Sequence, residues 1–301
     1  KDVTFNPRIY ADDKFIMQTE YRQSFMKTNL ISDFSYNNDG KNSNSHFFTN
    51  INGNLDEGSN FKFSYQSVTN DNYLKIHNLS KSSPLIINES VLTSKFTYSK
   101  KIDSNTSFTS DFIAYEDLSK RNNDRFQYIL PNFTFSKNLE IDKNYNGNFQ
   151  FKSSGFQKNY DTNKYETLLI NDFLFKSNDY ISNRGLVTNY DLLIKNFNSY
   201  TENSTAYKRK EDYEVFGSFL IKSSLPLKKI DGLANNFLKP IASFRFSPNN
   251  TKNISNKDYR LSYDNIFSLN RIGTNEIVEG GKSISLGIEY EKKNNKNEKI
   301  V

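Results

Sequence analysis

An alternation of apolar and polar residues runs through this chain in segments of about ten residues, separated by polar turns. Phe61, Phe63 and Tyr65 alternate with polar neighbours, and Ile284 and Leu286 do the same near the other end of the sequence. Because successive side chains of an extended chain point to opposite faces, each segment has one apolar and one polar face. The sequence therefore predicts an all-β, antiparallel protein built from two-faced strands.

The alternating segments predict about fifteen strands, bounded by Asn, Asp, Gly, Ser and Lys. We expect strands at residues 3–10, 15–24, 30–36, 47–55, 60–68, 91–98, 106–115, 126–135, 147–156, 166–175, 186–196, 213–223, 238–246, 261–269 and 283–290. Short turns alternate with longer loops such as 69–90 and 198–212, an asymmetry typical of outer-membrane barrels.

Composition favours a polar interior and an apolar exterior. The hydrophobic fraction is 35% and the mean hydropathy is −0.75, yet the chain carries 26 Phe and 19 Tyr. No apolar run approaches the 18 or so residues that a membrane helix needs, whereas a membrane strand needs only about 9–11. We therefore expect a transmembrane antiparallel β-barrel.

The positive charge of the chain is dispersed. The net charge is +6 and the pI is near 9.0, and the densest basic run, Lys208-Arg209-Lys210, is followed at once by Glu211-Asp212. We interpret this basic run as a solvated loop. Because the remaining positive charges are not clustered, the sequence gives little support to a nucleic-acid partner. There is no Cys, which removes disulfides and thiolate metal sites.

Residues with catalytic or metal-binding chemistry are sparse. His46, expected in a polar turn, and His77, expected in a long loop, lie in no nucleophile motif. The segment Asp161-Thr162-Asn163 begins like a calcium loop but lacks the glycine and the distal glutamate, so we expect a simple turn. We expect no enzymatic activity, no metal and no cofactor.

Five short segments, in order along the chain, carry a family resemblance. They are Thr4-Phe5-Asn6-Pro7-Arg8-Ile9-Tyr10, Asp71-Asn72-Tyr73-Leu74, a strand that ends in Ser247-Pro248-Asn249, then Asp264-Asn265-Ile266-Phe267-Ser268-Leu269-Asn270-Arg271, and Val278-Glu279-Gly280-Gly281. Together they resemble the barrel domain of the LptD (OstA/Imp) family, which assembles lipopolysaccharide in the outer membrane. The part from 238 to 281 is the most specific.

The resemblance implies a larger barrel in the outer membrane of a Gram-negative bacterium. It implies passage of lipopolysaccharide, an LptE-like lipoprotein plug, and a periplasmic Lpt bridge that meets an N-terminal jelly roll. On this reading residues 1–301 are a partial barrel domain in contact with membrane lipid, without the jelly roll, the C-terminal barrel strands or the lateral seam. The function implied is transport of lipopolysaccharide into the outer leaflet.

Two sets of charged residues are candidate sites. Arg245, Asp264, Arg271 and Glu279 are expected either to form a lumen or loop network that holds a loop inward, or to contact phosphorylated sugars. Arg22, Lys62 and Lys152 stand at polar positions of their strands and are expected to face the lumen, as generic wetting or as a cationic track for an anionic glycolipid.

Two other functions remain open at this stage. A porin or uptake receptor would need a constriction loop or an N-terminal plug, and nothing in the sequence resembles a plug. A soluble β-rich surface adhesin would need no detergent. Fractionation separates the adhesin from the barrels, and the surface lipid after depletion separates an exporter from a porin.

Overall fold

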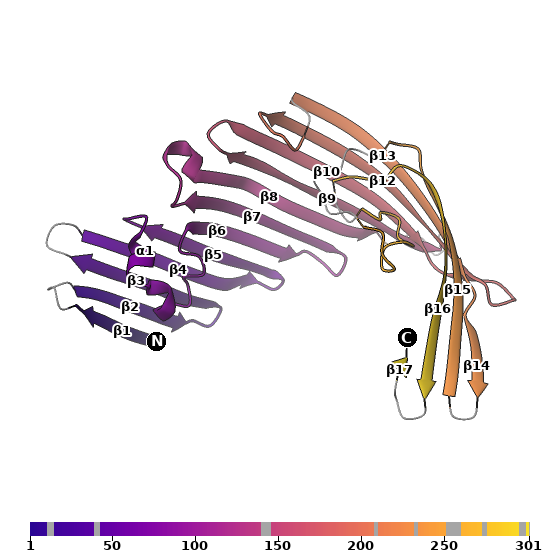
Figure 1. Cartoon of the computed structure of the whole chain (residues 1–301), viewed down its shortest axis with the longest axis horizontal. Coiled ribbons are helices and arrows are strands. Elements are labelled where there is room, and N and C mark those ends of the chain that lie inside the picture. Colours follow the sequence, from indigo (N-terminus) through magenta and orange to yellow (C-terminus); the bar gives the residue numbers. More distant parts are fainter. Residues whose placement is uncertain are drawn as a thin grey trace. The chain divides into compact units, whose positions relative to one another are not determined.

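The computed structural model describes most of the chain. The described residues are 1–10, 15–38, 43–139, 146–207, 210–231, 234–250, 260–272, 276–294 and 299–300. They form 17 strands assigned to one antiparallel sheet, with very little helix. The chain divides into two compact units, and several strands contribute a segment to each unit. Figure 1 shows the order of the strands.

The first unit begins with a run of antiparallel hairpins. Its complete strands are β1 (Asp2–Ile9), β2 (Phe15–Ser24), β3 (Thr28–Asn38), β4 (Ser43–Asp56), β5 (Ser59–Val68), β6 (Val91–Lys101) and β7 (Thr106–Asp117). Each pairs with the next along the sequence (Figure 1). The register places Phe96 opposite Phe112 and Phe63 opposite Phe96. Residues of like polarity therefore share a face from strand to strand, as the alternation predicts.

Five longer strands divide between the units. These are β8 (Phe126–Leu139), β9 (Gly147–Tyr160), β10 (Lys164–Ser177), β12 (Val187–Glu202) and β13 (Lys210–Ser224). β10 pairs with β9 and with β12. Strands of this length exceed the 9–11 or so residues that cross a bilayer at a tilt.

The second unit holds the remaining strands. These are β11 (Tyr180–Ile181), β14 (Leu227–Asp231), β15 (Ala234–Ser247), β16 (Gly281–Asn294) and β17 (Lys299–Ile300). β15 pairs with β13, β14 and β16, and its register with β16 runs from Ala234 opposite Asn294 to Ser247 opposite Gly281. A loop of more than thirty residues, 248–280, connects β15 to β16, and its described part is not a strand.

In the part of the chain that the structure describes, helical structure is confined to loops. α1 (Tyr73–Ile76) and η1 (Leu79–Ser82) lie in the long loop between β5 and β6, and η2 (Asn122–Arg125) precedes β8. Among the described residues, no helix combines the length and the apolar character that crossing a membrane requires.

The predicted all-β antiparallel class is confirmed. Fourteen of the predicted segments overlap strands, and 15–24 matches β2 at both ends. The expected strand at 261–269 is wrong, because this segment forms turns. His46 lies within β4 and not in a polar turn, whereas His77 does lie in a loop. Asp161 and Thr162 form the predicted turn with positive φ values. Lys208 and Arg209 lie outside the described residues.

Candidate functional site

In each unit, one face of the sheet carries a row of exposed aromatic side chains. In the first unit Phe34, Phe47, Tyr65, Phe96 and Phe112 share this face, and each is 38–42% exposed. Five large rings exposed to this degree present on the order of 400 Å² of contiguous aromatic surface, which is already the size of the largest apolar patch on a typical soluble protein.

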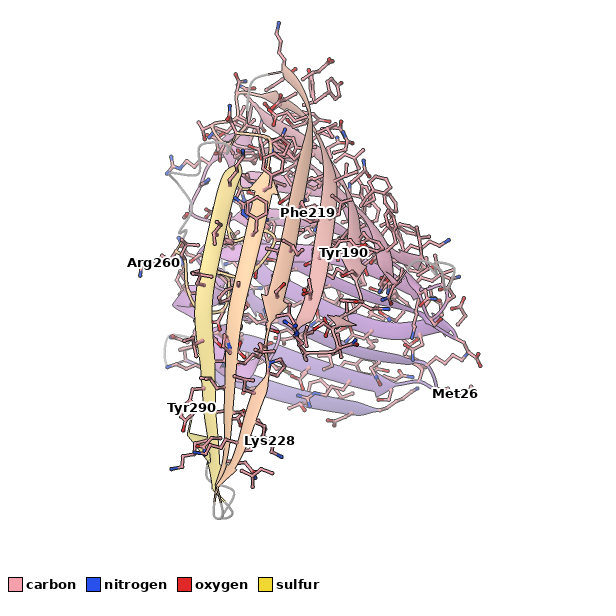
Figure 2. The ribbon with its side chains drawn as sticks, turned by 90° about the vertical axis from the view of Figure 1, so that its right-hand side faces the viewer. Met26, Tyr190, Phe219, Lys228, Arg260 and Tyr290 are labelled. Carbon is pink, nitrogen blue, oxygen red and sulfur yellow. The ribbon has the colours of Figure 1, made fainter. Side chains whose placement is uncertain are left out.

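The second unit continues the same pattern. Aromatic contacts join Phe151 to Phe173 (ring centroids 4.8 Å apart), Phe175 to Tyr190 (5.6 Å) and Tyr190 to Phe219 (6.3 Å). Figure 2 shows Tyr190 and Phe219 on neighbouring strands β12 and β13. No second layer of protein among the described residues covers these rings, so each unit presents an apolar wall to its surroundings.

The opposite face is polar, and it carries the predicted lumen cations. Arg22 lies opposite Asp2 in the β1–β2 register, and its Nε lies 2.6 Å from Glu20 Oε1. Lys62 lies between Asn52 and Thr97 and is exposed. Lys152 on β9 lines a cavity of the second unit. Arg22, Lys62 and Lys152 therefore occupy the polar face of their strands, and their position in a lumen stays a prediction.

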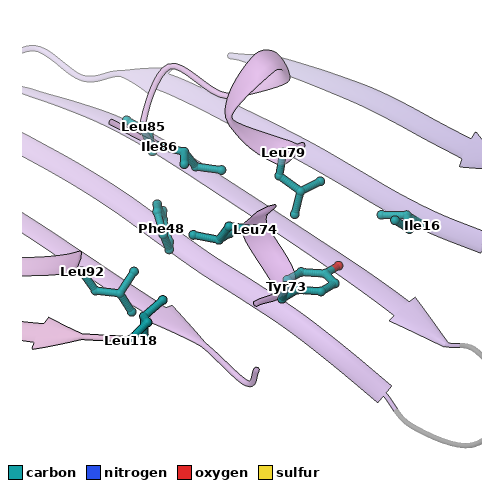
Figure 3. Packing of buried hydrophobic residues seen from close by; sticks show 9 residues of the cluster. All are labelled: Ile16, Phe48, Tyr73, Leu74, Leu79, Leu85, Ile86, Leu92 and Leu118. Atoms are coloured by element: carbon teal, nitrogen blue, oxygen red, sulfur yellow. The ribbon is translucent and has the colours of Figure 1, made fainter. Parts of the chain in front are cut away.

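In the first unit the loop between β5 and β6 folds onto this polar face. Tyr73, Leu74 and Leu79 of the loop are at most 1% exposed and pack with Ile16 and Phe48 of the sheet (Figure 3). Leu85, Ile86, Leu92 and Leu118 complete the cluster. This small apolar core accounts for Ile16 and Phe48 on the mainly polar face, and Ile31 and Val68 of the same face pack against it.

Buried polar contacts hold the same loop. Arg8 of β1 donates to the His77 carbonyl (2.5 Å) and to Ser82 Oγ (2.6 Å), and Ser82 Oγ donates to Gln18 Oε1 (2.6 Å). Gln18 in turn donates to both oxygens of Asp33, at 3.2 and 3.1 Å. The chain of contacts ties the loop to the first three strands, and in a buried setting each member that lost its partner would be costly.

A serine, a histidine and an aspartate meet beneath this loop. Ser35 Oγ lies 2.5 Å from His46 Nδ1 and 2.9 Å from the Tyr73 hydroxyl, and His46 Nε2 lies 3.1 Å from Asp33 Oδ2. Burial raises the pKa of the Tyr73 phenol, so this hydroxyl stays protonated. Ser35, His46 and Asp33 are each at most 1% exposed. As arranged they anchor the loop and offer no surface to a substrate.

Arg125 adds a contact at the outer end of the loop. Its Nη2 lies 2.7 Å from both Asp71 Oδ1 and Glu116 Oε1, and these carboxylates raise the pKa of the guanidinium, the hydrogen bond to Asp71 being the larger cause. Asp71 is the first residue of one of the segments that carry the family resemblance. Because Arg125 pairs with both Asp71 of the loop and Glu116 of β7, it orients this end of the loop relative to β7.

In the second unit, three of the four predicted loop charges come together. Arg245 of β15 is 2% exposed and donates to the carbonyls of Glu279 (2.6 Å) and Gly280 (3.0 Å), and its Nη2 lies 3.3 Å from Glu279 Oε1. Arg271 donates from Nε to Glu279 Oε2 at 2.8 Å and also contacts Oε1 through Nη2. We call Arg245, Glu279 and Arg271 the latch. Asp264 is exposed and is not part of it.

The latch holds a loop that runs back along the polar face. Ser285 Oγ donates to the Ile266 carbonyl (3.3 Å). The Phe267 ring packs against Gly287, where a Cβ atom would lie only 2.8 Å from Cζ of the ring. Tyr263 donates to Glu289, which raises the pKa of the phenol. Glu289 is eight positions into β16 from Gly281, so the loop reaches about 26 Å along the strand.

The residues that carry the family resemblance also fix the base of this loop. Ser247 Oγ donates to the Gly217 carbonyl (2.7 Å), while Asn249 accepts from the Gly217 amide (2.9 Å) and donates to the Val215 carbonyl (3.1 Å). The motif at 247–249 thus ends β15 and ties it to β13. The motif around 264–281 supplies the returning loop and its latch.

Sequence reasoning missed several residues of these contacts. Arg8, Gln18 and Tyr73 form the anchors of the first loop, and the contacts of Arg8 span 69 and 74 positions. A buried arginine and glutamine on polar positions of adjacent strands look the same in sequence as solvated ones. The signal that was present is the pair Ile16 and Phe48, which interrupts the polar face.

Fold and site together define a two-faced antiparallel sheet of the outer-membrane β-barrel type, with loops folded onto the polar face. No family model and no curated protein matches the chain. Among solved structures, a "Bacterial polysaccharide outer membrane secretin" superposes with a TM-score of 0.34 and 7% identity, covering 93% of this chain and 78% of that chain. A superposition this loose indicates no shared function.

Proposed function

We propose that this chain forms part of the barrel wall of an LptD-like protein that transports lipopolysaccharide to the outer leaflet of the outer membrane of a Gram-negative bacterium. Transport would act by geometry and electrostatics, without chemistry on the substrate. The observation that supports this most is that the resembling residues at 245–249 and 271–279 work together, as the latch and the base of one loop. The aromatic face would meet lipid, and the polar face would line the lumen.

The partners follow from the resemblance. Lipopolysaccharide would pass its sugars along the polar face, an LptE-like lipoprotein would occupy the lumen, and a periplasmic Lpt bridge would deliver lipid through an N-terminal domain. The 26 Å or so over which the second loop follows β16 corresponds, for a strand tilted by about 45°, to roughly 18 Å of the 30 Å hydrocarbon core. The loop therefore has the reach to narrow such a lumen over more than half of its depth.

Depletion of the protein in its own cell tests this function. The proposal expects loss of newly made lipopolysaccharide from the cell surface, measured by labelling the lipopolysaccharide that is exposed on intact cells. It also expects the protein in the membrane fraction, from which detergent is needed to extract it. Re-expression of the intact gene restores the surface lipid and serves as the control. Unchanged surface lipid after depletion would refute lipopolysaccharide transport, and recovery of the protein without detergent would instead support the adhesin.

The inward loops favour a second candidate, a porin or uptake receptor. A constriction loop is the feature that this alternative requires, and two loops lie on the polar face. The same depletion separates the two functions. A porin expects altered uptake of small solutes with surface lipopolysaccharide unchanged.

A further inference from the structure

An open groove of about 490 Å³ lies on the apolar face of the second unit. Its floor is formed by the small side chains of Ser223 and Ala242, which face each other on β13 and β15. The Ser223 hydroxyl shares a hydrogen bond with Thr188 Oγ1 at 2.9 Å, so this group already has a partner. The groove therefore presents apolar surface to its surroundings. Larger apolar side chains form its walls: Leu186, Leu225, Leu286 and Ile288.

The register shows which face of the sheet the groove occupies. Ala242 pairs with Leu286 and lies two positions from Phe244, which is exposed with the other aromatic side chains of this face. On the opposite face Phe267 covers Gly287, and Phe267 is not a wall of the groove. All of the lining residues belong to the second unit. An alkyl chain fits such a groove, because it fills a depression between larger side chains and gains dispersion contacts there.

A row of polar residues crosses the same face at a distance from the groove. Lys229 of β14, Asn236 of β15 and Lys292 of β16 are paired in the register, and Figure 2 shows these three strands side by side. Adjacent strands are about 4.8 Å apart, so both lysine side chains can reach one anion placed between them. In the part of the chain that the structure describes, no carboxylate lies within 4.0 Å of either ammonium group.

Tyr290 indicates the level at which this face meets a membrane interface. Its side chain is exposed on the apolar face, and its hydroxyl donates to Asn236 Oδ1 at 2.9 Å. Tyrosine concentrates at the headgroup level of membrane proteins, where the ring meets hydrocarbon and the hydroxyl meets water. With Oδ1 occupied, Asn236 Nδ2 remains to donate to an anion. The row therefore combines two cations and an amide donor at headgroup level.

The polar row and the groove are separated by the depth of one lipid leaflet. Asn236 and Ala242 are six positions apart on β15, which is about 20 Å along the strand. For a strand tilted by about 45°, this corresponds to roughly 14 Å of depth, close to half of the 30 Å hydrocarbon core. Leu238 lies between them on the same face. A lipid whose phosphate lies at the polar row would therefore extend an acyl chain into the groove.

We propose that the apolar face of β13 to β16 binds an anionic glycerophospholipid, with its phosphate between Lys229 and Lys292 and one acyl chain in the groove over Ala242. The proposal rests on the part of the proposed function that places the aromatic face in a membrane. It goes beyond general contact with lipid by assigning one lipid class to one place. It does not depend on transport of lipopolysaccharide.

The test is native mass spectrometry of the intact protein, released from non-ionic detergent and titrated with phosphatidylglycerol. The proposal expects one phosphatidylglycerol to bind about tenfold or more tightly than phosphatidylcholine, whose headgroup carries no net charge. The double variant Lys229→Gln/Lys292→Gln should lose about tenfold or more of this affinity, because each lysine beside an anionic headgroup contributes about fivefold. A double variant that binds like the parent, with its β-sheet circular dichroism unchanged, would overturn the site.

The matched control is Lys228→Gln/Lys293→Gln. These lysines occupy the next positions of the same strands, but they lie over the Phe237 ring on the polar face, at 5.6 and 5.3 Å from its centroid. The control removes the same charge and should keep the affinity within about threefold, because the ions of the buffer screen charges that are not at the headgroup. Equal losses in the two double variants would show that only net charge matters and would overturn the site.

A third variant tests the groove. Ala242→Phe fills it and should weaken phosphatidylglycerol binding about fivefold or more, because about ten atom pairs of the acyl chain lose contact. An unchanged affinity would overturn the assignment of the acyl chain.

Further arms separate this site from the proposed function. Lipopolysaccharide that binds the site more tightly than phosphatidylglycerol would overturn the phospholipid assignment. Phosphatidylglycerol binding that persists while depletion leaves surface lipopolysaccharide intact would refute export alone. Equal binding of phosphatidylglycerol and phosphatidylcholine, together with loss of surface lipopolysaccharide on depletion, would refute the phospholipid site alone.

Discussion

Replacement of Arg245 by methionine should release the loop that runs along β16. The side chain is 2% exposed, and the substitution removes the hydrogen bonds to the Glu279 and Gly280 carbonyls at 2.6 and 3.0 Å and the ion pair at 3.3 Å. Loss of one partner of a buried charged pair costs about 3–5 kcal/mol. Because Arg271 still pairs with the Glu279 carboxylate, we take the lower value, about 3 kcal/mol.

A local loss of about 3 kcal/mol corresponds to at least a hundredfold faster amide exchange wherever exchange proceeds by opening of the loop. The reporters are the amides of Ile266 and Ser268, which donate within the loop at 3.0 and 2.9 Å. Hydrogen exchange with mass spectrometry, on peptides that cover 260–272, measures them. Peptides from β3 and β4 in the first unit should exchange as in the parent protein.

Two further variants sharpen this test. Arg245→Lys keeps the charge but loses the planar fork that reaches two carbonyls, so it should give an intermediate increase in exchange. Lys239→Gln removes a polar-face ion pair whose side chains are 42% and 39% exposed, worth at most about 1 kcal/mol, and should change exchange in the loop little. An Arg245→Met protein whose loop exchanges within threefold of the parent, as Lys239→Gln should, would show that the latch does not hold the loop.

Two more predictions concern the loop contact and a surface turn. Gly287→Ala should displace Phe267 and lower stability by about 1–3 kcal/mol in thermal unfolding, because the new methyl group would lie 2.8 Å from the ring. The control is Gly217→Ala, whose Cβ meets nothing within 4 Å and which should cost less than about 1 kcal/mol. Equal effects of the two substitutions would contradict the packing of Phe267 on Gly287. The pKa of Asp161 is lowered chiefly by the hydrogen bond from Lys164. The charged carboxylate therefore stabilises the fold, by about 1 kcal/mol at most for this exposed pair. This stabilisation is present above the unfolded pKa near 4 and is lost as pH falls through the folded pKa. Asp161→Asn should therefore lower thermal stability at pH 7 but not at pH 2, and an equal loss at both values would rule out the charge as the cause.

The strand pattern was readable from the sequence because one local rule governs it. Within a strand, residues an even number of positions apart share a face, so the alternation fixes which residues are on the same side. The register then sets Phe96 opposite Phe112, which keeps the aromatic residues of neighbouring strands on one face. The same rule failed at 261–269. There Phe267 and Leu269 alternate with polar residues, but the loop packs onto β16 and the polar face, which buries Leu269 and half-buries Phe267.

The candidate site was only partly predictable. Arg245, Arg271 and Glu279 were identified as candidates from the motif. Their mutual contacts depend on the loop between β15 and β16, which folds back along β16. Asp264 belongs to the same motif but points to solvent. The anchors of the first loop join Arg8 to His77 across 69 positions, a contact that no local period encodes. Long-range contacts of this kind are fixed by tertiary packing and leave no trace in the alternation.

The account depends most on which face of the sheet meets lipid. The chain contains no Trp, so a single introduced indole reports one position. Phe96→Trp places it on the aromatic face and Thr97→Trp places it on the polar face of the same strand. After reconstitution into vesicles of brominated lipid, fluorescence of the Phe96→Trp protein should be strongly quenched and that of the Thr97→Trp protein should not. Equal quenching of the two, or stronger quenching at position 97, would contradict a wall whose aromatic face lies in the membrane.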